Sequence, residues 1–179
     1  MILPDPMILF SIIAVLSIVQ SIFGMGILVF GTPTLLLLGL DFVPTLQYLL
    51  PASLAISALQ VITSYKHRVP ISKNLYFVCL PAIALALWLT VKPEFSSRIQ
   101  YLVGFTLLAS AVIREVEFTN RWMNASVVRF ETLFQFSMGI VHGLTNLGGA
   151  LLAIYSGTQQ EEKIKVRYVI AYYYLAFGI

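Results

Sequence analysis

Three polar residues stand close together in a long apolar stretch and are the strongest candidates for chemistry. His142 is the only residue between Thr132 and Gln160 whose side chain ionises near neutral pH, and Thr145 and Asn146 follow it by three and four residues. Near neutral pH a histidine can place a positive charge beside a bound anion or carry a proton. Thr145 and Asn146 would supply O–H and N–H donors to an oxyanion. The alternatives are a neutral imidazole bonded to a neighbouring helix, and a Thr and an Asn that cap a helix or bond across to another one.

A second cluster of the same kind lies 122 residues earlier. The pairs at this offset are Gln20 with His142, Gly24 with Asn146, and Gly26 with Gly148. Each cluster has a polar residue, then small residues, then a resumed apolar stretch. Ser21 accompanies Gln20, and Gly31 precedes Thr32-Pro33. A Thr followed by Pro is typical of a helix N-cap and first turn, so we predict that a half-helix starts there and offers its free N–H groups to an anion.

Glycines in the middle of both stretches indicate interrupted helices. Glycine adopts backbone angles that other residues avoid. A helix broken inside lipid must bury its free N–H and C=O groups in protein or line a watery cavity. Two such breaks in corresponding halves point to the binding site of a transporter. Packing alone is the simpler alternative, because Gly139 and Gly143 form a small-x-x-x-small pattern that lets two helices approach closely.

Composition places these clusters in a membrane protein. Of 179 residues, 59% are hydrophobic and 11% are charged, and the mean hydropathy is +0.88. Ordinary soluble domains carry about 25% charged residues, so this chain cannot coat a water-soluble surface. That excludes a secreted enzyme, a nucleic-acid-binding module, a disordered tail and a disulfide scaffold. The single cysteine, Cys79, excludes a disulfide framework and a cysteine cluster for zinc.

Charged residues divide the chain into apolar stretches. A straight span needs about 20 apolar residues, so the 35 uncharged residues between Asp5 and Asp41 must bend, break or re-enter. We expect an all-α fold: a polytopic transmembrane helix bundle with two related halves, each starting with a glycine-interrupted (broken or re-entrant) helix. The first half, 1–131, is predicted to hold a broken helix at 7–40, spans at 42–65, 74–91 and 99–113, and a polar loop at 114–131. The second half, 132–179, is predicted to hold a broken helix at 132–160 and an incomplete span at 168–179. Two or three further spans would complete it.

Basic residues predict the orientation. Lysine and arginine mark cytoplasmic loops, and the segment 66–73 is the clearest such loop, with 114–131 on the same side two spans later. Lys163, Lys165 and Arg167 join that side only if 132–160 forms a re-entrant hairpin. If 132–160 crosses the membrane once, the excess of lysine and arginine on the cytoplasmic side nearly disappears. The positive-inside rule therefore favours the hairpin. The aromatic run 172–174 is interpreted as an interfacial or packing group.

Two glycine motifs carry a family resemblance. The first leads from Gly24-Met25-Gly26 into Gly31-Thr32-Pro33-Thr34-Leu35. The second is Gly139-x-x-x-Gly143-x-x-Asn146-x-Gly148-Gly149, followed by Tyr155 and a basic segment that ends at Arg167. The pair covers nearly the whole chain and resembles the TauE/SafE family, the sulfite-exporter and sulfonate-permease group of membrane proteins. The resemblance implies a bundle of two halves, usually with seven to eight spans, that moves small anions of sulfur or carbon.

We therefore expect a multi-pass transporter in the cytoplasmic membrane of a prokaryote. Its substrate would be a small anion such as sulfite, a sulfonate or a related sulfur oxyanion, and it would work by alternating access at a site between the two broken helices. The candidate substrate-binding residues are Gln20, Ser21, Gly24, Gly26, Gly31, Thr32, His142, Gly143, Thr145, Asn146, Gly148 and Gly149.

The expected partners are the anion and the lipid bilayer. No cofactor, metal or nucleic acid is expected, and a homo-oligomer is left open. Enzymatic activity is not expected, because the sequence has no HExxH motif, no Cys/His cluster and no serine with a neighbouring base. No Asp or Glu lies deep in an apolar stretch, so either His142 carries a coupling proton or the protein is a facilitator. The alternative function is a non-transporting membrane subunit that assembles with another protein.

Overall fold

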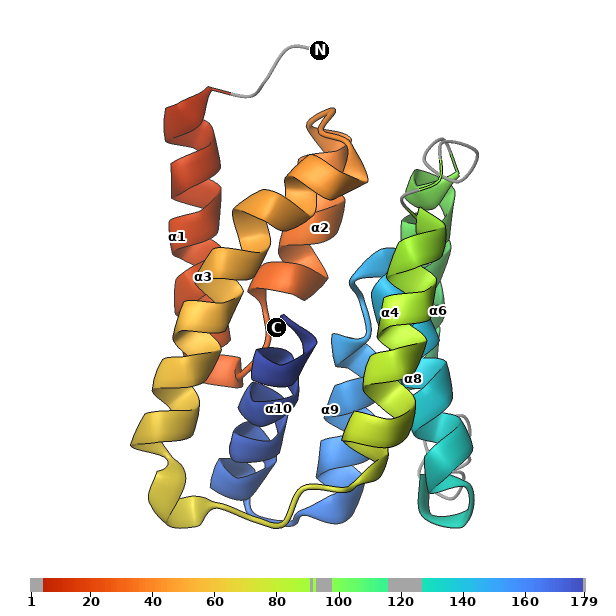
Figure 1. The fold of residues 1–179 in the computed structure, drawn as a ribbon. Coiled ribbons are helices and arrows are strands. Elements are labelled where there is room, and N and C mark those ends of the chain that lie inside the picture. Colours follow the sequence, from red (N-terminus) through yellow and green to blue (C-terminus); the bar gives the residue numbers. More distant parts are fainter. Residues whose placement is uncertain (1–4, 91, 93–97, 116–126, 179) are drawn as a thin grey trace.

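The computed structural model describes residues 5–90, 92, 98–115 and 127–178. Within these ranges every regular element is a helix (Figure 1), which confirms the predicted all-α fold. Most of the predicted polar loop, residues 116–126, lies outside the described residues. The helices group into two hairpins with further helices packed around them.

The first hairpin consists of α1 (Pro6–Phe23) and α2 (Ile27–Leu37). At the start of α1 the Asp5 carboxylate accepts a hydrogen bond from the Met7 N–H at 2.8 Å, which caps the helix. The helix ends at Gly24, whose φ of 82° is left-handed and whose N–H donates to the Gln20 carbonyl at 2.8 Å. α2 then returns toward the end where α1 began (Figure 1). The stretch 7–40 is therefore a broken helix that turns back on itself.

The start of α2 corrects one prediction. The helix begins at Ile27, and Thr32 and Pro33 lie inside it. The Gln20 side chain explains the earlier start, because its Oε1 accepts from the Ile27 N–H at 3.2 Å and so replaces a local cap. A cap supplied by a residue seven positions away is not part of the Thr-Pro signature, which made the prediction wrong.

The middle helices coincide with the predicted stretches 42–65, 74–91 and 99–113 to within a few residues. They are α3 (Phe42–Thr63), the short turn η1 (Tyr65–His67), the π-helical turn η2 (Leu75–Cys79), α4 (Leu80–Thr90) and α6 (Ile99–Glu115). η2 and α4 follow each other without interruption and form one continuous apolar helix.

The second hairpin consists of α8 (Glu131–Thr145) and α9 (Gly149–Gln159). α8 ends at Asn146, the one non-glycine residue with a positive φ (61°) in the described chain, and its N–H donates to the His142 carbonyl at 2.6 Å. In Figure 1 α8 and α9 open toward the lower end of the molecule, whereas α1 and α2 open toward the upper end. The two hairpins thus enter the bundle from opposite ends.

The last helix, α10 (Lys163–Phe177), starts five residues before the predicted 168. The prediction begins the span at the first residue after the charged segment. In the structure Lys163, Lys165 and Arg167 all lie within the first two turns of the helix. Long basic side chains can extend away from an apolar helix while their stems pack against it. The charged segment therefore belongs to the helix and not to a loop before it.

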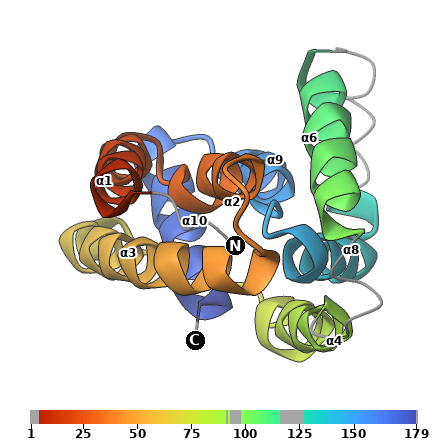
Figure 2. The same ribbon diagram turned by 90° about the horizontal axis from the view of Figure 1, so that it is seen from above.

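Seen from above, α2 and α9 lie between α1 and α3 on one side and α4, α6 and α8 on the other (Figure 2). Two helices, α1 and α3, are long and apolar enough to cross a membrane, and Ile27–Leu37, Leu75–Thr90 and Ile99–Ala111 are shorter apolar helices. The two helix breaks face the interior of this arrangement, since Gly24, Gly26, Asn146 and Gly148 are all buried.

Candidate functional site

The first break is filled by the side chain of Gln20, which is completely buried. Its Oε1 accepts from the first N–H of α2, and its Nε2 donates to the hydroxyls of Ser53 and Ser57 on α3 at 3.1 and 3.2 Å. Gln60 of α3 donates to the carbonyl oxygens of Gln20 and Ser21 at 2.9 and 3.1 Å, so two of the last four carbonyls of α1 are bonded as well. The polar groups described here are thus hydrogen-bonded to other groups of the protein.

Replacing Gln20 by leucine is expected to destabilise the fold by about 3 kcal/mol, because it leaves the Ile27 N–H and two serine hydroxyls without their partner. Unfolding of the purified protein in detergent measures the loss. Ser21→Ala is the matched control, since Ser21 is exposed and its hydroxyl bonds only the Ile18 carbonyl of its own helix. Equal stability of the two variants would contradict the role of Gln20.

The second break is tied to the first hairpin by a hydrogen bond between buried side chains. Asn146 Nδ2 donates to Thr32 Oγ1 of α2 at 2.9 Å. A Cβ atom placed on Gly149, the first residue of α9, would lie 2.7 Å from Val29 Cγ2 near the start of α2. The amino-terminal turns of the two half-helices therefore meet. This geometry settles one alternative, because Asn146 bonds across to another helix.

Two buried polar atoms beside this break have no hydrogen-bond partner among the described residues. They are His142 Nδ1 and the Tyr174 hydroxyl, on side chains that are 4% and 1% exposed. The His142 ring packs on Tyr174 and Phe177 of α10, with centroid distances of 6.2 and 4.5 Å. A Cβ atom on Gly148 would lie 3.1 Å from His142 Nδ1, and one on Gly149 would overlap the Tyr174 hydroxyl. Both partnerless groups thus point at the first residues of α9.

The second break has the chemistry of a small anion site. The first N–H groups of a helix lack intrahelical partners and carry partial positive charge, and an imidazole N–H and a phenol O–H can both donate. Burying such groups without partners costs free energy that a bound acceptor would recover. The Tyr174 side chain fills the space against Gly149.

Several of the residues predicted to bind the substrate do not lie at the second break. Ser21 is exposed. Gly31 lies against Leu49, where a Cβ atom would be 2.9 Å from a methyl group. Thr145 donates to the Val141 carbonyl of its own helix at 2.7 Å. Gly143 faces α4, on the packing side of α8. Gly143 is predicted to bind the ligand, but in the structure it follows the small-x-x-x-small alternative, because its missing Cβ makes room for α4.

Several residues at the two breaks were missed by the sequence interpretation. They are Ser53, Ser57 and Gln60, which hold the first break, and Tyr174 and Phe177, which enclose His142. The three polar residues of α3 recur at a spacing of three to four, which marks one helix face and could have been noticed. Tyr174 was assigned to an interfacial or packing group; it is buried and packs, as does Tyr173.

A carboxylate also lies between helices, at the end of the molecule where α8 begins. Glu131 Oε1 accepts from the Tyr155 hydroxyl at 2.9 Å and from Gln135 Nε2 at 3.0 Å. Glu131 and Tyr155 line a pocket of about 270 Å³, whose other walls come from the segment 70–72, the end of α9 and α10. The sequence indicates no acidic group for coupling, because Glu131 precedes the apolar stretch and meets Tyr155 only where α9 folds back along α8.

Comparison with family models, curated proteins and solved structures returns no match to this chain. Function must therefore be argued from the geometry of the two breaks.

Proposed function

We propose that this chain forms a membrane transporter for small anions of the TauE/SafE type, with sulfite, sulfonates or related sulfur oxyanions as substrates. The observation that carries the proposal is the meeting of two broken helices at His142 and Tyr174, two buried groups whose polar atoms lack partners among the described residues. Transport would follow the alternating exposure of this site to the two sides of the membrane.

A multi-pass membrane location is supported by side chains that face outward. Leu37, Phe10 and Phe105 are 89%, 73% and 72% exposed, and they come from α2, α1 and α6. Water-soluble monomers rarely expose large apolar side chains over several helices at once, whereas lipid tails accept them. Most basic residues of the described chain lie at the end of the fold that holds the 64–74 segment and the starts of α8 and α10, whereas Lys92 and Arg98 lie at the other end, where α4 ends and α6 begins (Figure 1). The positive-inside rule makes that end cytoplasmic.

An inverted repeat is supported by the backbone at the two breaks. Gly24 and Asn146, which correspond at the offset of 122 residues, both have positive φ and both donate to the carbonyl four residues earlier. Downstream, Phe30 donates to Gly26 and Leu152 to Gly148, each at 2.9 Å. The hairpins nevertheless run in opposite directions (Figure 1). Inverted repeats with discontinuous helices are a common plan of secondary transporters.

The two breaks differ in a way that assigns the ligand to the second one. Gln20 bonds α2 and α3 with its whole amide group, whereas its counterpart His142 is enclosed by aromatic rings and keeps Nδ1 unbonded. The stretch from Thr132 to Gln160 contains no acidic residue that would repel an anion. We propose that the first break is structural and that the second binds the anion.

Flux into liposomes tests the proposal. Wild-type protein is expected to carry sulfite or methanesulfonate faster than empty liposomes do. His142→Phe keeps the ring packing but removes both nitrogens, so flux should fall roughly tenfold or more, the equivalent of one hydrogen bond to a charged group. Ser11→Ala is the control, since Ser11 is exposed on α1 and bonds only the Met7 carbonyl. Wild-type flux equal to that of empty liposomes would favour the non-transporting subunit instead.

A further inference from the structure

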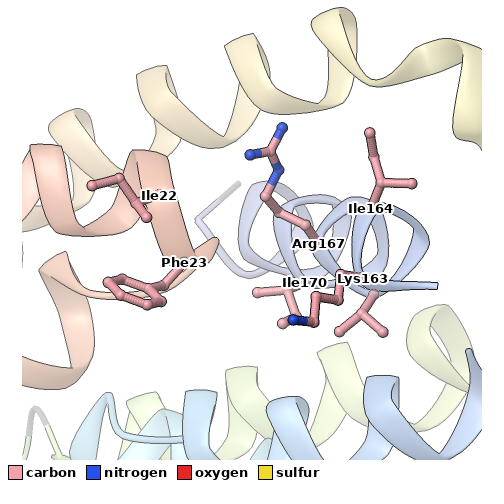
Figure 3. Close-up of a pocket in the computed structure, with 7 residues that line it drawn as sticks. Ile22, Phe23, Lys163, Ile164, Arg167 and Ile170 are labelled. Atoms are coloured by element: carbon pink, nitrogen blue, oxygen red, sulfur yellow. The ribbon is translucent and has the colours of Figure 1, made fainter. Parts of the chain in front are cut away.

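A pocket separate from the one at Glu131 lies at the first break, between the end of α1 and the first turns of α10 (Figure 3). It has a volume of about 440 Å³. Its walls come from the last two residues of α1 and from one face of α10: Ile22, Phe23, Lys163, Ile164, Val166, Arg167 and Ile170. The stem of Arg167 packs against the bend itself, since a Cβ atom on Gly24 would lie 3.2 Å from Arg167 Cγ.

The charge of this pocket is positive and is not balanced by the residues that line it. Lys163 and Arg167 are its charged side chains, and both belong to the first two turns of α10, where the helix dipole adds to their charge. The nearest acidic residue along the chain, Glu162, bonds Lys165 at 2.6 Å, and Lys165 does not line the pocket. Arg167 Nε is buried and has no hydrogen-bond partner among the described residues.

The rest of the wall is apolar: Ile22 and Phe23 come from α1, and Ile164, Val166 and Ile170 come from α10 with the two cations (Figure 3). A small, strongly hydrated ion such as sulfate would gain little from that surface. A molecule with an anionic head and a short hydrocarbon part would place its head at Lys163 and Arg167 and its tail against the isoleucines and Phe23. Apolar contact of this kind contributes about 25 cal/mol for each Å² removed from water.

We propose that this pocket is a binding site for an organic anion with a sulfonate, carboxylate or phosphate head and a short apolar part. The inference rests on the proposed function in one respect, namely that the site would collect the transported anion. Arg167, Ile170 and Tyr174 are spaced by three and four residues, so they share one face of α10 and lead from Gly24 to Gly149. The pocket is an access site on the cytoplasmic end, one to two helical turns from the second break.

Binding is tested with butane-1-sulfonate as the probe, by its effect on the thermal stability of the purified protein in neutral detergent. We expect saturable stabilisation, weakened about tenfold in apparent affinity by Lys163→Gln, the loss of one of two charged contacts. Arg167→Gln should weaken it as much, and Arg167→Lys should restore part of it. Lys165→Gln is the matched control, because Lys165 carries the same charge on the same turn outside the pocket. Equal binding by Lys163→Gln, Lys165→Gln and wild type would overturn the site.

A second experiment distinguishes a lipid head group from a free organic anion as the ligand. Nanodiscs of phosphatidylcholine alone are compared with nanodiscs that contain phosphatidylglycerol, with and without the sulfonate. Competition between lipid and sulfonate, lost in Lys163→Gln, supports the site. Stabilisation by the anionic lipid alone overturns the free anion as ligand, and stabilisation by neither overturns the proposal. Sulfonate binding by the wild-type protein without flux would reject the transporter and leave this site standing.

Discussion

Leucine in place of Gly143 is expected to separate α8 from α4 and leave little folded protein. A Cβ atom at this position would lie 2.6 Å from both the Ala86 Cβ and the Ile83 carbonyl oxygen. Backbone cannot yield as a flexible side chain can, so we expect a loss of roughly 3 kcal/mol or more in the free energy of unfolding. Titration of the purified protein with denaturant in detergent micelles measures it.

Gly157→Leu is the control for this substitution. Gly157 also lies within a helix of the second hairpin, but no heavy atom lies within 4 Å of its added Cβ. The exchange there should change stability little, or raise it slightly because leucine favours helix more than glycine does. If Gly143→Leu were as stable as Gly157→Leu, the close packing of α8 on α4 would be wrong.

Alanine in place of Gly149 is expected to displace Tyr174 from the start of α9. The added methyl group would overlap the Tyr174 hydroxyl, which is buried and cannot swing into solvent. We expect a loss of roughly 1 to 2 kcal/mol in stability and at least a tenfold loss of anion flux, since the donors of the second break no longer converge. Unfolding in detergent and flux into liposomes measure the two effects separately.

The double variant Gly149→Ala/Tyr174→Phe separates the steric effect from the chemical one. Removing the hydroxyl makes room for the methyl group, so stability should recover. Flux should stay low if the hydroxyl binds the anion. Full flux in Tyr174→Phe alone would show that this hydroxyl takes no part, and Gly157→Ala serves as the neutral exchange within α9.

Local sequence was enough to locate both helix breaks. The long uncharged stretch before Asp41 could not be one straight span, and a glycine that takes a left-handed backbone angle ends α1 at Gly24. Asn146, which stands 122 residues later, also has a positive φ, and asparagine is one of the few other residues that tolerate such an angle. The positions of the breaks follow from the backbone angles that single residues allow and from the length of the uncharged stretch. Both can be read from a short segment of sequence.

Predictions about the partners of each side chain were less successful. Thr32 carries a local capping signature, but it lies inside α2 and accepts from Asn146, 114 positions away. Gln20 and Ser21 looked equally suitable as ligands, and α3 buries one while the other faces outward. Adjacent residues on a helix differ by about 100° in direction, so the packing of a distant helix decides which of them is buried.

The sequence by itself determined that the chain is helical and apolar, where its helices break and which polar residues stand at the breaks, because composition, periodicity and backbone angles are local properties. Only the tertiary structure decided that the hairpins enter from opposite ends, that Gln20 is bonded on all sides while His142 is not, and that Tyr174 faces Gly149. Those outcomes depend on contacts between different helices, such as Gln20 with Ser53 and Asn146 with Thr32, which are 33 and 114 residues apart in the sequence. Such contacts are selected by the packing of the whole bundle and leave no periodic signal in any one segment.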